Sequence, residues 1–494
     1  MQLPGKIACA LLISIALLTS GCGGGSSGSG GGGTTPPPPP STANEWTWMS
    51  GSNTVNAVGI YGSQGLASAS NVPGARSYSA GWTDSSGNLW LFGGWGFATN
   101  GAVGATGSLN DLWEFTPSTK EWTWVGGSNT ASIDQGGGNV WGVYGTQGVA
   151  SPNNIPGPRV SAATWKDSGG NFWLFGGDGF PSSKGYNCCI NPPFGPLNDL
   201  WEFTPLTKEW TWVSGSDVIS NANGVYGTQG VSSPNNFPGA RSGAMSWTDT
   251  NGNLWFFGGS GYSDFWEFST STKEWTWMAG GNTTGATPIY GTQGVAAASN
   301  TPGGRSGSVT WTDKNGNLWL YGGAAPGINY DLSDLWEFNP STKEWTWVSG
   351  GNAGGVLPIY GTQGTASASN TPGGRDSAVG WTDSSGNLWI FGGFDYDTTT
   401  GANGTNDFLN DLWKFDTTTK EWTWVGGSNV GNANGAYGAL GTPSASNVPG
   451  ARGSEGVALT WTDNSGNFWL FGGDGYGATG AADSLLNDLW RYQP

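Results

Sequence analysis

Two carboxylates beside arginines are the residues of this chain whose types and spacing suit acid–base chemistry. Ten of the eleven glutamates lie in repeated blocks, and Glu455 alone does not. Glu455 follows Arg452 by three residues, and Asp376 lies directly beside Arg375. Carboxylates held near a cation can move protons to and from a sugar, so Glu455 and Asp376 are our candidates for catalysis. The alternative is that they only adjust the local charge.

Arginine recurs once in each of six units of the chain. The six positions are Arg76, Arg159, Arg241, Arg305, Arg375 and Arg452. A guanidinium at the start of a strand can grip the carboxylates of a ligand, so these residues are candidates for binding. An aspartate also recurs later in each unit, and an ion pair with it is the structural alternative.

Aromatic residues in the variable parts of the units give a second set of binding candidates. The segment between a repeated Gly-Gly pair and the repeated aspartate spans from 4 to 21 residues. Variation confined to such segments is typical of a scaffold that places its interactions there. The candidates in these segments are Trp95, Tyr186, Tyr262, Tyr330, Tyr396 and Tyr476.

The composition excludes several kinds of site. The chain has no histidine, which excludes Ser-His-Asp catalysis, His-ligated zinc and two-His copper sites. The net charge is −17 and the basic residues are dispersed, which excludes nucleic-acid binding. Adjacent Cys188 and Cys189 are candidates for a vicinal disulfide. Asp395, Asp397 and Asp407 are a candidate calcium set, but their spacing matches no dedicated calcium loop, so we expect no cofactor and no metal.

The first residues predict export and a lipid anchor. Lys6, an apolar run over 7–18 and small residues before Cys22 have the layout of a secretory signal. The placement of the cysteine resembles a bacterial lipobox, so we expect a signal at 1–21, a lipidated Cys22 and a Gly/Ser/Pro-rich tether over 22–44. The expected location is the cell envelope, anchored to the outer membrane and facing either the periplasm or the outside. Ordinary cleavage and full secretion is the alternative.

The elements that must position the candidates are short strands. Each unit contains Pro-Gly-x-Arg, an apolar strand ending in Trp-Thr-Asp, Asn-Leu-Trp-Leu-Phe-Gly-Gly, Asp-Leu-Trp-Glu-Phe and Glu-Trp-Thr-Trp, or close variants of these. Asp and Gly three residues apart predict a type I turn after the first strand. Each unit therefore predicts a four-stranded antiparallel meander. Thirty of the 32 Trp residues occupy repeat positions, which indicates core packing.

The repeats predict a ring. The first Glu-Trp-Thr-Trp, at Glu45 to Trp48, precedes any unit, and the last unit ends at Pro494 without one. We expect an all-β, six-bladed propeller over 45–494, closed by residues 45–49 as the outer strand of the last blade.

These residues resemble the kelch repeat family, because a Gly-Gly pair ends the second strand, an aromatic lies in the third strand and a Trp lies in the fourth. The Gly-Gly pairs, from Gly93-Gly94 to Gly472-Gly473, are intact in all six units. The resemblance implies the propeller fold, and its members include binding proteins and enzymes. Galactose-oxidase-type copper chemistry is excluded here by the absence of histidine. A sialic-acid mutarotase type of activity stays open, with Glu455, Asp376 and the six arginines as candidates.

We therefore expect a monomeric, lipid-anchored binding propeller for a protein or glycan ligand. Its binding face is predicted to carry the segments between the second and third strands and between the fourth and first strands. The alternatives are a carbohydrate-active enzyme and a structural protein of the envelope.

Overall fold

β-Strands and their connections make up the described part of the protein, in which no helix is present. The computed structural model describes residues 43–99, 106–132, 140–184, 194–219, 223–328, 330–397, 405–453, 457–480 and 484–494. The chain divides into two units, Met1–Ser41 and Thr42–Pro494, each with its own internal contacts. The described residues all belong to the second unit. Within the described ranges there is no helix of the length and hydrophobicity that crossing a membrane requires.

Six antiparallel sheets, numbered here in chain order, contain the strands of the six repeats. The first sheet has β4 (Ala80–Thr83), β5 (Leu89–Phe97), β6 (Thr106–Thr116) and β7 (Glu121–Gly126). The second has β9 (Ala163–Lys166), β10 (Phe172–Phe175), β13 (Leu200–Thr204) and β14 (Glu209–Ser214). The third has β15 (Met245–Thr248), β16 (Leu254–Phe257), β17 (Phe265–Ser269) and β18 (Glu274–Ala279).

The remaining three sheets follow the same order of strands. The fourth has β19 (Val309–Thr312), β20 (Leu318–Gly323), β21 (Leu332–Asn339) and β22 (Glu344–Ser349). The fifth has β23 (Val379–Thr382), β24 (Leu388–Asp397), β25 (Thr405–Asp416) and β26 (Glu421–Gly426). The sixth has β27 (Leu459–Thr462), β28 (Phe468–Asp474), β29 (Leu485–Gln493) and β1 (Glu45–Ser50). The predicted all-β fold of four-stranded antiparallel sheets is confirmed.

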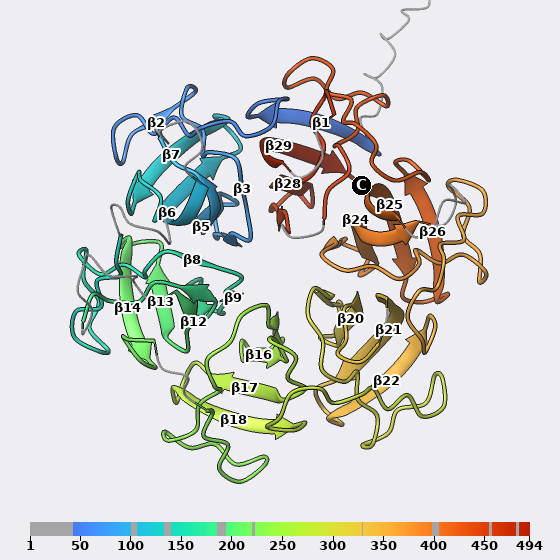
Figure 1. Ribbon diagram of the computed structural model, residues 1–494, viewed down its shortest axis with the longest axis horizontal. Coiled ribbons are helices and arrows are strands. Elements are labelled where there is room, and N and C mark those ends of the chain that lie inside the picture. Colours follow the sequence, from blue (N-terminus) through green and yellow to red (C-terminus); the bar gives the residue numbers. More distant parts are fainter. Residues whose placement is uncertain are drawn as a thin grey trace, which may run out of the picture. The chain divides into compact units, whose positions relative to one another are not determined.

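The sixth sheet joins residues from both ends of the described chain. β1 pairs antiparallel with β29, with Trp46 opposite Tyr492 and Trp48 opposite Trp490. Figure 1 shows β1 lying beside β29, although more than 400 residues separate them in the sequence. The outer strand of this sheet is therefore contributed by the N-terminal segment.

The turn after the first strand of each sheet is built by its aspartate. In the first sheet, Gly87 donates its N–H to the carbonyl of Asp84, as a type I turn requires. The Asp84 carboxylate accepts the N–H groups of Ser86 and Asn88 and the indole N–H of Trp90. The same aspartate-to-glycine bond closes the corresponding turn of the other five sheets. The predicted turn chemistry is confirmed.

The Gly-Gly pairs create a bulge where the second strand passes the core. Gly93 and Gly94 have φ angles of 63° and 99°, in the left-handed region that favours glycine. A Cβ on Gly93 would lie 2.8 Å from the carbonyl oxygen of Leu109, which leaves no room for a side chain. The register of β5 against β6 shifts at this point. The bulge also turns the Gly93 carbonyl towards Arg76, which donates to it at 3.1 Å.

Short strands beyond the bulge and in the entering loops extend the first sheet and form one further small sheet. β2 (Ala67–Ser68) pairs with β7, and β3 (Arg76–Ser77) pairs with β5. β8 (Arg159–Val160), β11 (Asp178–Gly179) and β12 (Gly195–Pro196) form a small sheet beside the second one. The pairing of β2 with β7 covers the edge of an outer strand, which would otherwise offer unpaired backbone groups.

Hydrophobic clusters fill the interfaces between neighbouring sheets. The described residues form six clusters, and each combines residues from two sheets that are adjacent in order, one of them joining the sixth sheet to the first. The first-strand Trp of each sheet donates its indole N–H to a main-chain carbonyl of the next sheet. The donors are Trp82, Trp165, Trp247, Trp311, Trp381 and Trp461. The last of them bonds to Trp90 of the first sheet.

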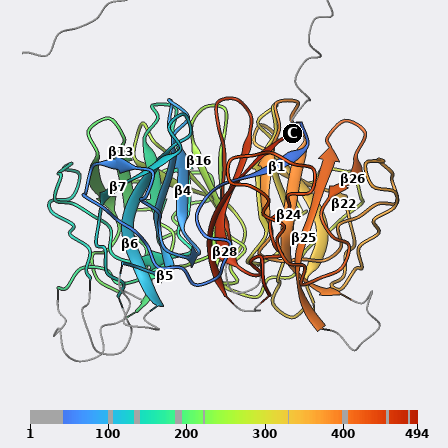
Figure 2. The same ribbon diagram turned by 90° about the horizontal axis from the view of Figure 1, so that it is seen from above.

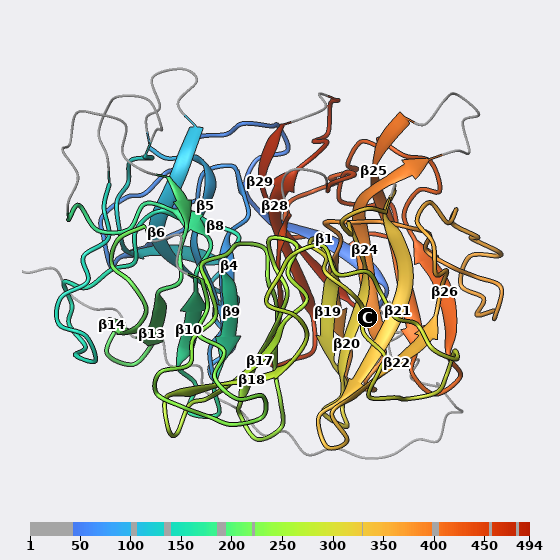
Figure 3. The ribbon, with the colours of Figure 1, turned by 60° about the horizontal axis from the view of Figure 1, so that its bottom comes forward.

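The first strands lie inside and the fourth strands outside. β4, β9, β15, β19, β23 and β27 contact one another in this order, and β27 also contacts β4. Figure 1 shows the sheets following one another around a common centre, with β7, β14, β18, β22, β26 and β1 at the periphery. Figure 2 and Figure 3 show the sheets from other sides, with β4 and β28 near the middle and β26 outside. The fold is propeller-like.

Candidate functional site

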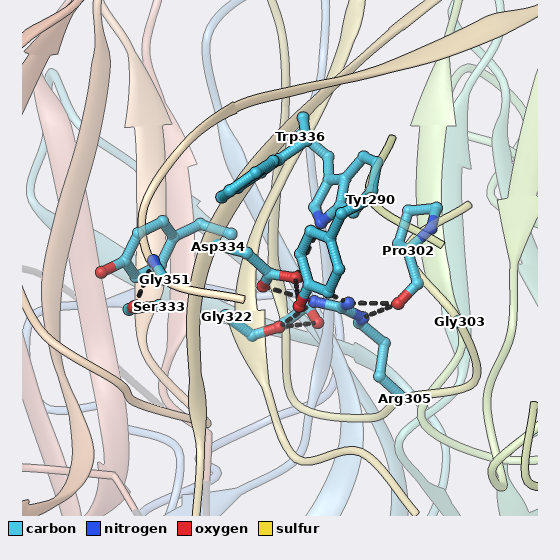
Figure 4. A network of polar contacts seen from close by, with 12 residues as sticks. Tyr290, Pro302, Gly303, Arg305, Gly322, Ser333, Asp334, Trp336 and Gly351 are labelled. Carbon is cyan, nitrogen blue, oxygen red and sulfur yellow. Dashed lines mark hydrogen bonds and ion pairs between the residues drawn. The ribbon is translucent and has the colours of Figure 1, made fainter. Parts of the chain in front are cut away.

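A buried arginine–aspartate pair links the start of the first strand to the third strand, and Figure 4 shows it in the fourth sheet. Arg305 Nη1 and Nη2 lie 2.8 and 3.0 Å from Asp334 Oδ1 and Oδ2. Tyr290, from the loop that enters the sheet, donates its hydroxyl to the same carboxylate at 2.9 Å. Trp336 donates its indole N–H to it at 2.8 Å. The carboxylate is therefore satisfied by one cation and two neutral donors.

The same arrangement of Tyr, Asp, Arg and Trp occurs in all six sheets. The ion pairs are Arg76–Asp111, Arg159–Asp199, Arg241–Asp264, Arg305–Asp334, Arg375–Asp411 and Arg452–Asp488. Burial lowers the pKa of Arg76, but Asp111 and Tyr61 together raise it by more, so the net pKa lies above its ordinary value. Burial and then Asp111 raise the pKa of Tyr61, which keeps the phenol protonated and able to donate. The cluster therefore contains one ion pair and has no net charge, and it links the entering loop to the sheet.

The six arginines therefore face their own sheets. Their side chains are almost completely buried, and none of them is among the residues that line a described cavity. At Arg76, four hydrogen bonds of the guanidinium are already directed at the Asp111 carboxylate and at the main-chain carbonyls of Gly74 and Gly93. The ion pair that the sequence offered as the structural alternative is the arrangement found.

A cavity of about 890 Å³ lies among the approaches to the six first strands. Each sheet contributes lining residues, and hydroxyl groups predominate among its polar side chains. The hydroxyl-bearing lining residues are Tyr78, Ser79, Ser161, Ser242, Ser246, Ser260, Ser306, Ser308, Thr310 and Ser377. Asp178 and Ser260 reach the cavity from segments between second and third strands, and Phe394 reaches it from the last part of β24. The cavity thus lies at the end of the sheets where the sequence varies.

Four of the thirteen non-glycine residues with a positive φ in the described part of the chain line this cavity. The residue two positions after the arginine has a positive φ in five sheets: Tyr78 (57°), Ser161 (54°), Gly243 (64°), Gly307 (70°) and Ser377 (52°). Glycine adopts this conformation without penalty, whereas a residue with a Cβ pays about 1 kcal/mol. Main-chain bonds tie these residues to one another across the sheets, as from Ser161 N–H to the Tyr78 carbonyl at 3.1 Å.

Asp376 brings a carboxylate to the cavity. Its backbone is fixed by two hydrogen bonds with Phe394, of 3.1 and 2.9 Å. Its Oδ1 atom is buried and has no hydrogen-bond partner among the described residues. A ligand that brings a hydrogen-bond donor into the cavity could satisfy this acceptor.

The surroundings of Asp376 favour its protonated form. Burial, followed by the charge of Asp331, raises the pKa of Asp376 to about 7, and Asp395 adds to this. Ser377 acts in the opposite direction by hydrogen bonding. Burial alone raises the pKa of Asp331 to about 6. A carboxylic acid that titrates near pH 7 is suited to accept and return a proton under physiological conditions.

The described residues offer no metal centre. No group of three or more Cys, Asp or Glu side chains with the arrangement of a metal site is found in the ranges that the structure covers. Asp407, from the predicted calcium set, belongs to no such group in these ranges. The side chain of Asp397 is not among the described atoms.

A second cavity, of about 520 Å³, lies at the other end of the first strands. It is lined by the repeated Trp-Thr pairs and shares Ser246 and Thr310 with the first cavity. Thr312 Oγ1 donates to the Thr248 carbonyl at 3.3 Å, and Thr382 Oγ1 donates to the Thr312 carbonyl at 3.2 Å. The hydroxyls and the indole N–H groups here serve the contacts between sheets.

The other predicted site residues are scattered. Trp95 is half-buried in β5 opposite Ser77, and Tyr262 lies under the Arg241 guanidinium at 4.4 Å. Tyr330 is 53% exposed, and the Tyr476 ring contacts the Phe408 ring. None of these four lines the first cavity, and Asp376 is the predicted candidate that does so among those described.

Several predicted residues fall outside the described part. These are Glu455, Tyr186, Cys22, Cys188 and Cys189, together with the side chain of Tyr396. Their roles stay predictions.

Sequence reasoning missed Tyr78, Ser161 and Ser377. Their signal is nonetheless in the sequence, because the residue two positions after the arginine is glycine in Gly243 and Gly307 and a larger residue in these three units. The importance of this position could be recognised only from the φ angles, because Gly and Ser are both common in loops.

Comparisons with known proteins leave the family open. No family model matches the chain, and no curated protein matches it either. Among solved structures, the chain is similar to the one titled "Structure of YjhT", with 13% sequence identity and a TM-score of 0.46. The match covers 85% of this chain and 95% of that one.

Proposed function

We propose that this protein is a ligand-binding propeller whose ligand occupies the hydroxyl-lined cavity of about 890 Å³. The observation that carries the proposal is the strained lining. Tyr78, Ser161 and Ser377 keep side chains at a backbone conformation that Gly243 and Gly307 adopt without strain. Strain retained at the wall of a cavity is explained when the side chains contact a ligand.

A glycan is the ligand class that this lining fits best. The volume lies within the range of small-ligand pockets, about 300 to 1,000 Å³. Serine and tyrosine hydroxyls both donate and accept hydrogen bonds, as sugar hydroxyls do. A peptide or protein ligand would use the variable segments around the cavity, and it is the alternative within this proposal.

The proposed architecture is a closed, six-bladed propeller of the kelch type. The contacts from β27 to β4 and the Trp461 to Trp90 bond support closure, and the pairing of β1 with β29 supports the N-terminal strand as the outer strand of the last blade. The intact Gly-Gly pairs support the kelch type.

Cavity-filling variants test the proposed site. Ser161→Tyr and Ser377→Tyr introduce a residue that the chain already carries at the equivalent Tyr78, so the backbone should accept it. We expect the purified protein to bind members of a glycan array and the double variant to lose that binding. Thr130→Tyr, at an exposed outer loop, is the control. Binding that survives in the double variant would place the ligand elsewhere.

A sugar-modifying enzyme is the second candidate. Asp376 supports it, because its pKa of about 7 and its unpartnered Oδ1 suit proton transfer to a sugar hydroxyl. Exchange between sugar anomers, followed by NMR for wild type and Asp376→Asn, tests this activity. Equal exchange rates for wild type, for Asp376→Asn and for buffer alone would contradict the proposed enzymatic activity.

We also propose that Cys22 carries the lipid that anchors the protein to the cell envelope. The sequence before Cys22 supports this, as does the Gly/Ser/Pro-rich segment that follows it. Metabolic labelling with a fatty-acid analogue should mark the wild-type protein and not Cys22→Ser. Labelling of both forms would contradict the assignment.

A further inference from the structure

The charges that line the first cavity are all of one sign. Among its described lining residues, Asp178 and Asp376 are the ionisable acids, and no lysine or arginine is present. Asp178 lies in β11 of the small three-stranded sheet, and Asp376 forms an isolated bridge with Phe394 of the fifth sheet, so carboxylates reach the cavity from two different repeats.

The nearby cations are already neutralised. Arg375 precedes Asp376 in the chain, but its Nη1 and Nη2 atoms lie 2.7 and 3.0 Å from the Asp411 carboxylate. The corresponding arginine of each other sheet is held by its own aspartate. The six arginines and their six aspartates therefore neutralise one another within the sheets. None of these arginines neutralises the carboxylates that line the cavity.

The groups that act on Asp376 reinforce this field. Asp331 and Asp395 both raise its pKa by repulsion, and Ser377 is the group that favours its charged form. Asp331 and Asp395 are themselves buried. The Oδ1 atom of Asp376 lacks a donor. A ligand that brings a hydrogen-bond donor with positive charge would satisfy this atom and relieve the repulsion.

From this arrangement we infer that the cavity selects a cationic polyhydroxyl ligand, an amino sugar or another polyol that carries an ammonium group. The ammonium lies against Asp376, and the hydroxyls of the ligand exchange hydrogen bonds with the serines. The same field disfavours acidic sugars. This inference rests on the proposed function, because it assigns a charge class to the ligand of the proposed site.

Three matched polyols test the selection. D-Glucamine, D-glucitol and D-gluconate share a six-carbon polyhydroxyl chain and carry an ammonium, a neutral or a carboxylate group at one end. Their affinities are measured by NMR titration of the full-length protein at low salt near pH 8, where Asp376 is ionised and an alkyl ammonium keeps its proton. We expect D-glucamine to bind about fivefold or more tightly than D-glucitol, and D-gluconate to bind more weakly than both.

Two variants with the same chemical change locate the effect. Asp376→Asn keeps the size of the side chain and should reduce the preference for D-glucamine over D-glucitol towards one. Asp416→Asn makes the same change at an exposed turn whose carboxylate caps the N–H groups of Thr418 and Thr419, and it should leave the preference unchanged. Melting curves of both variants establish that they are folded.

The outcomes separate the inference from the proposed function. Equal affinities for the three polyols, or a preference for D-gluconate, would overturn the charge selection and leave a polyol-binding cavity in place. A preference for D-glucamine that persists in Asp376→Asn would also overturn it, because the charge would lie elsewhere. Absence of binding by all three would count against the proposed function itself.

Discussion

At the scale of single residues, Asp376 couples the stability of the fold to pH. Its pKa is about 7 in the folded protein, mainly because of burial, and an aspartate in an unfolded chain has a pKa of about 3.9. The folded state therefore holds an extra proton between about pH 4 and pH 7. The contribution of Asp376 to the free energy of unfolding is therefore most favourable below this window and is lost as the pH rises through it. Asp331, with a pKa of about 6, adds in the same direction.

Asp376→Asn should therefore stabilise the protein at high pH and not at low pH. At pH 8 we expect a gain on the order of 2 to 4 kcal/mol in the free energy of unfolding, because the buried charge is removed. Near pH 4 the wild-type carboxyl is already neutral, so the gain should approach zero. Chemical denaturation at both pH values measures it, with Asp416→Asn as the control. A gain that is equal at the two pH values would show that charge is not its cause.

The serines with a positive φ predict that glycine at these positions raises stability and weakens ligand binding. Ser161→Gly and Ser377→Gly restore the residue that Gly243 and Gly307 provide in the third and fourth sheets. Each change should stabilise the fold by about 0.5 to 1 kcal/mol, because the left-handed conformation no longer carries a Cβ penalty, and the added chain entropy offsets only part of this.

The same glycine variants should weaken the binding of D-glucamine, since they remove hydroxyls from the cavity wall. Thermal melting and NMR titration measure the two effects on the same samples. Ser85→Gly, in an exposed turn with an ordinary φ, is the control and should be neutral or slightly destabilising. Variants that are stabilised and bind with full affinity would show that the serines are not ligand contacts.

At the scale of elements, the buried ion pair determines whether each entering loop closes on its sheet. Asp334 holds Arg305, Tyr290 and Trp336 together, which joins the loop, the first strand and the third strand. Asp334→Ala leaves a buried guanidinium without its partner, and such a loss costs about 3 to 5 kcal/mol. Denaturation curves measure the loss. Asp217→Ala, at a partly exposed ion pair with Lys184, should cost less than about 1 kcal/mol.

A smaller effect of Asp334→Ala, close to that of Asp217→Ala, would contradict the role of the cluster. Tyr290→Phe provides an intermediate case. It removes one donor from a carboxylate that keeps two others, so its cost should lie near 1 kcal/mol.

The strands were predictable from the sequence because each is encoded locally. Alternating aromatic residues, the Asp-to-Gly turn and the Gly-Gly pair recur in every unit, and six copies reveal which positions the strand requires. β2, β3, β8, β11 and β12 escaped prediction, because two-residue strands form only where a loop meets an edge that is already in place. The pairing of the arginines with the repeated aspartates was the favoured interpretation of the sequence, but binding of a ligand stayed open, since the partner lies between 23 and 40 residues away.

The cavity was harder to predict than the strands. Asp376 attracted notice because it breaks the repeat, and it does line the cavity. The conspicuous aromatics Trp95, Tyr262, Tyr330 and Tyr476 do not. Which of the residues near a strand start face the centre depends on the twist of six sheets and on positive φ angles, and neither can be read from a repeat pattern.

At the scale of the whole molecule, the contacts between sheets make the two ends of the chain depend on each other. Trp46 in β1 packs on Trp381 and Phe391 of the fifth sheet and on Trp490 and Tyr492 of its own sheet. It occupies the place that Trp122 holds in the first sheet, where the outer strand follows its neighbour through a short turn. β1 has no such turn to hold it against β29.

Trp46→Ala should therefore destabilise the protein by more than the loss of a buried side chain alone explains. Both Trp46→Ala and Trp122→Ala should cost about 3 to 5 kcal/mol through the cavity that they leave. In Trp46→Ala the detached β1 also exposes the edge of β29 and frees the contacts that link the sixth sheet to its neighbours, so cooperative unfolding should begin there. Hydrogen exchange followed by mass spectrometry measures where protection is lost.

As the denaturant concentration rises, we expect Trp46→Ala to lose amide protection first in β27, β28 and β29. The fifth and first sheets should lose protection next. Trp122→Ala should instead lose protection first in β6 and β7, while β1 stays protected against β29. The comparison isolates the effect of joining two distant segments from the effect of removing a large side chain. Identical exchange patterns outside the mutated sheet would mean that the pairing of β1 with β29 does not hold the sheets together, and the proposed closed propeller would lose its main support.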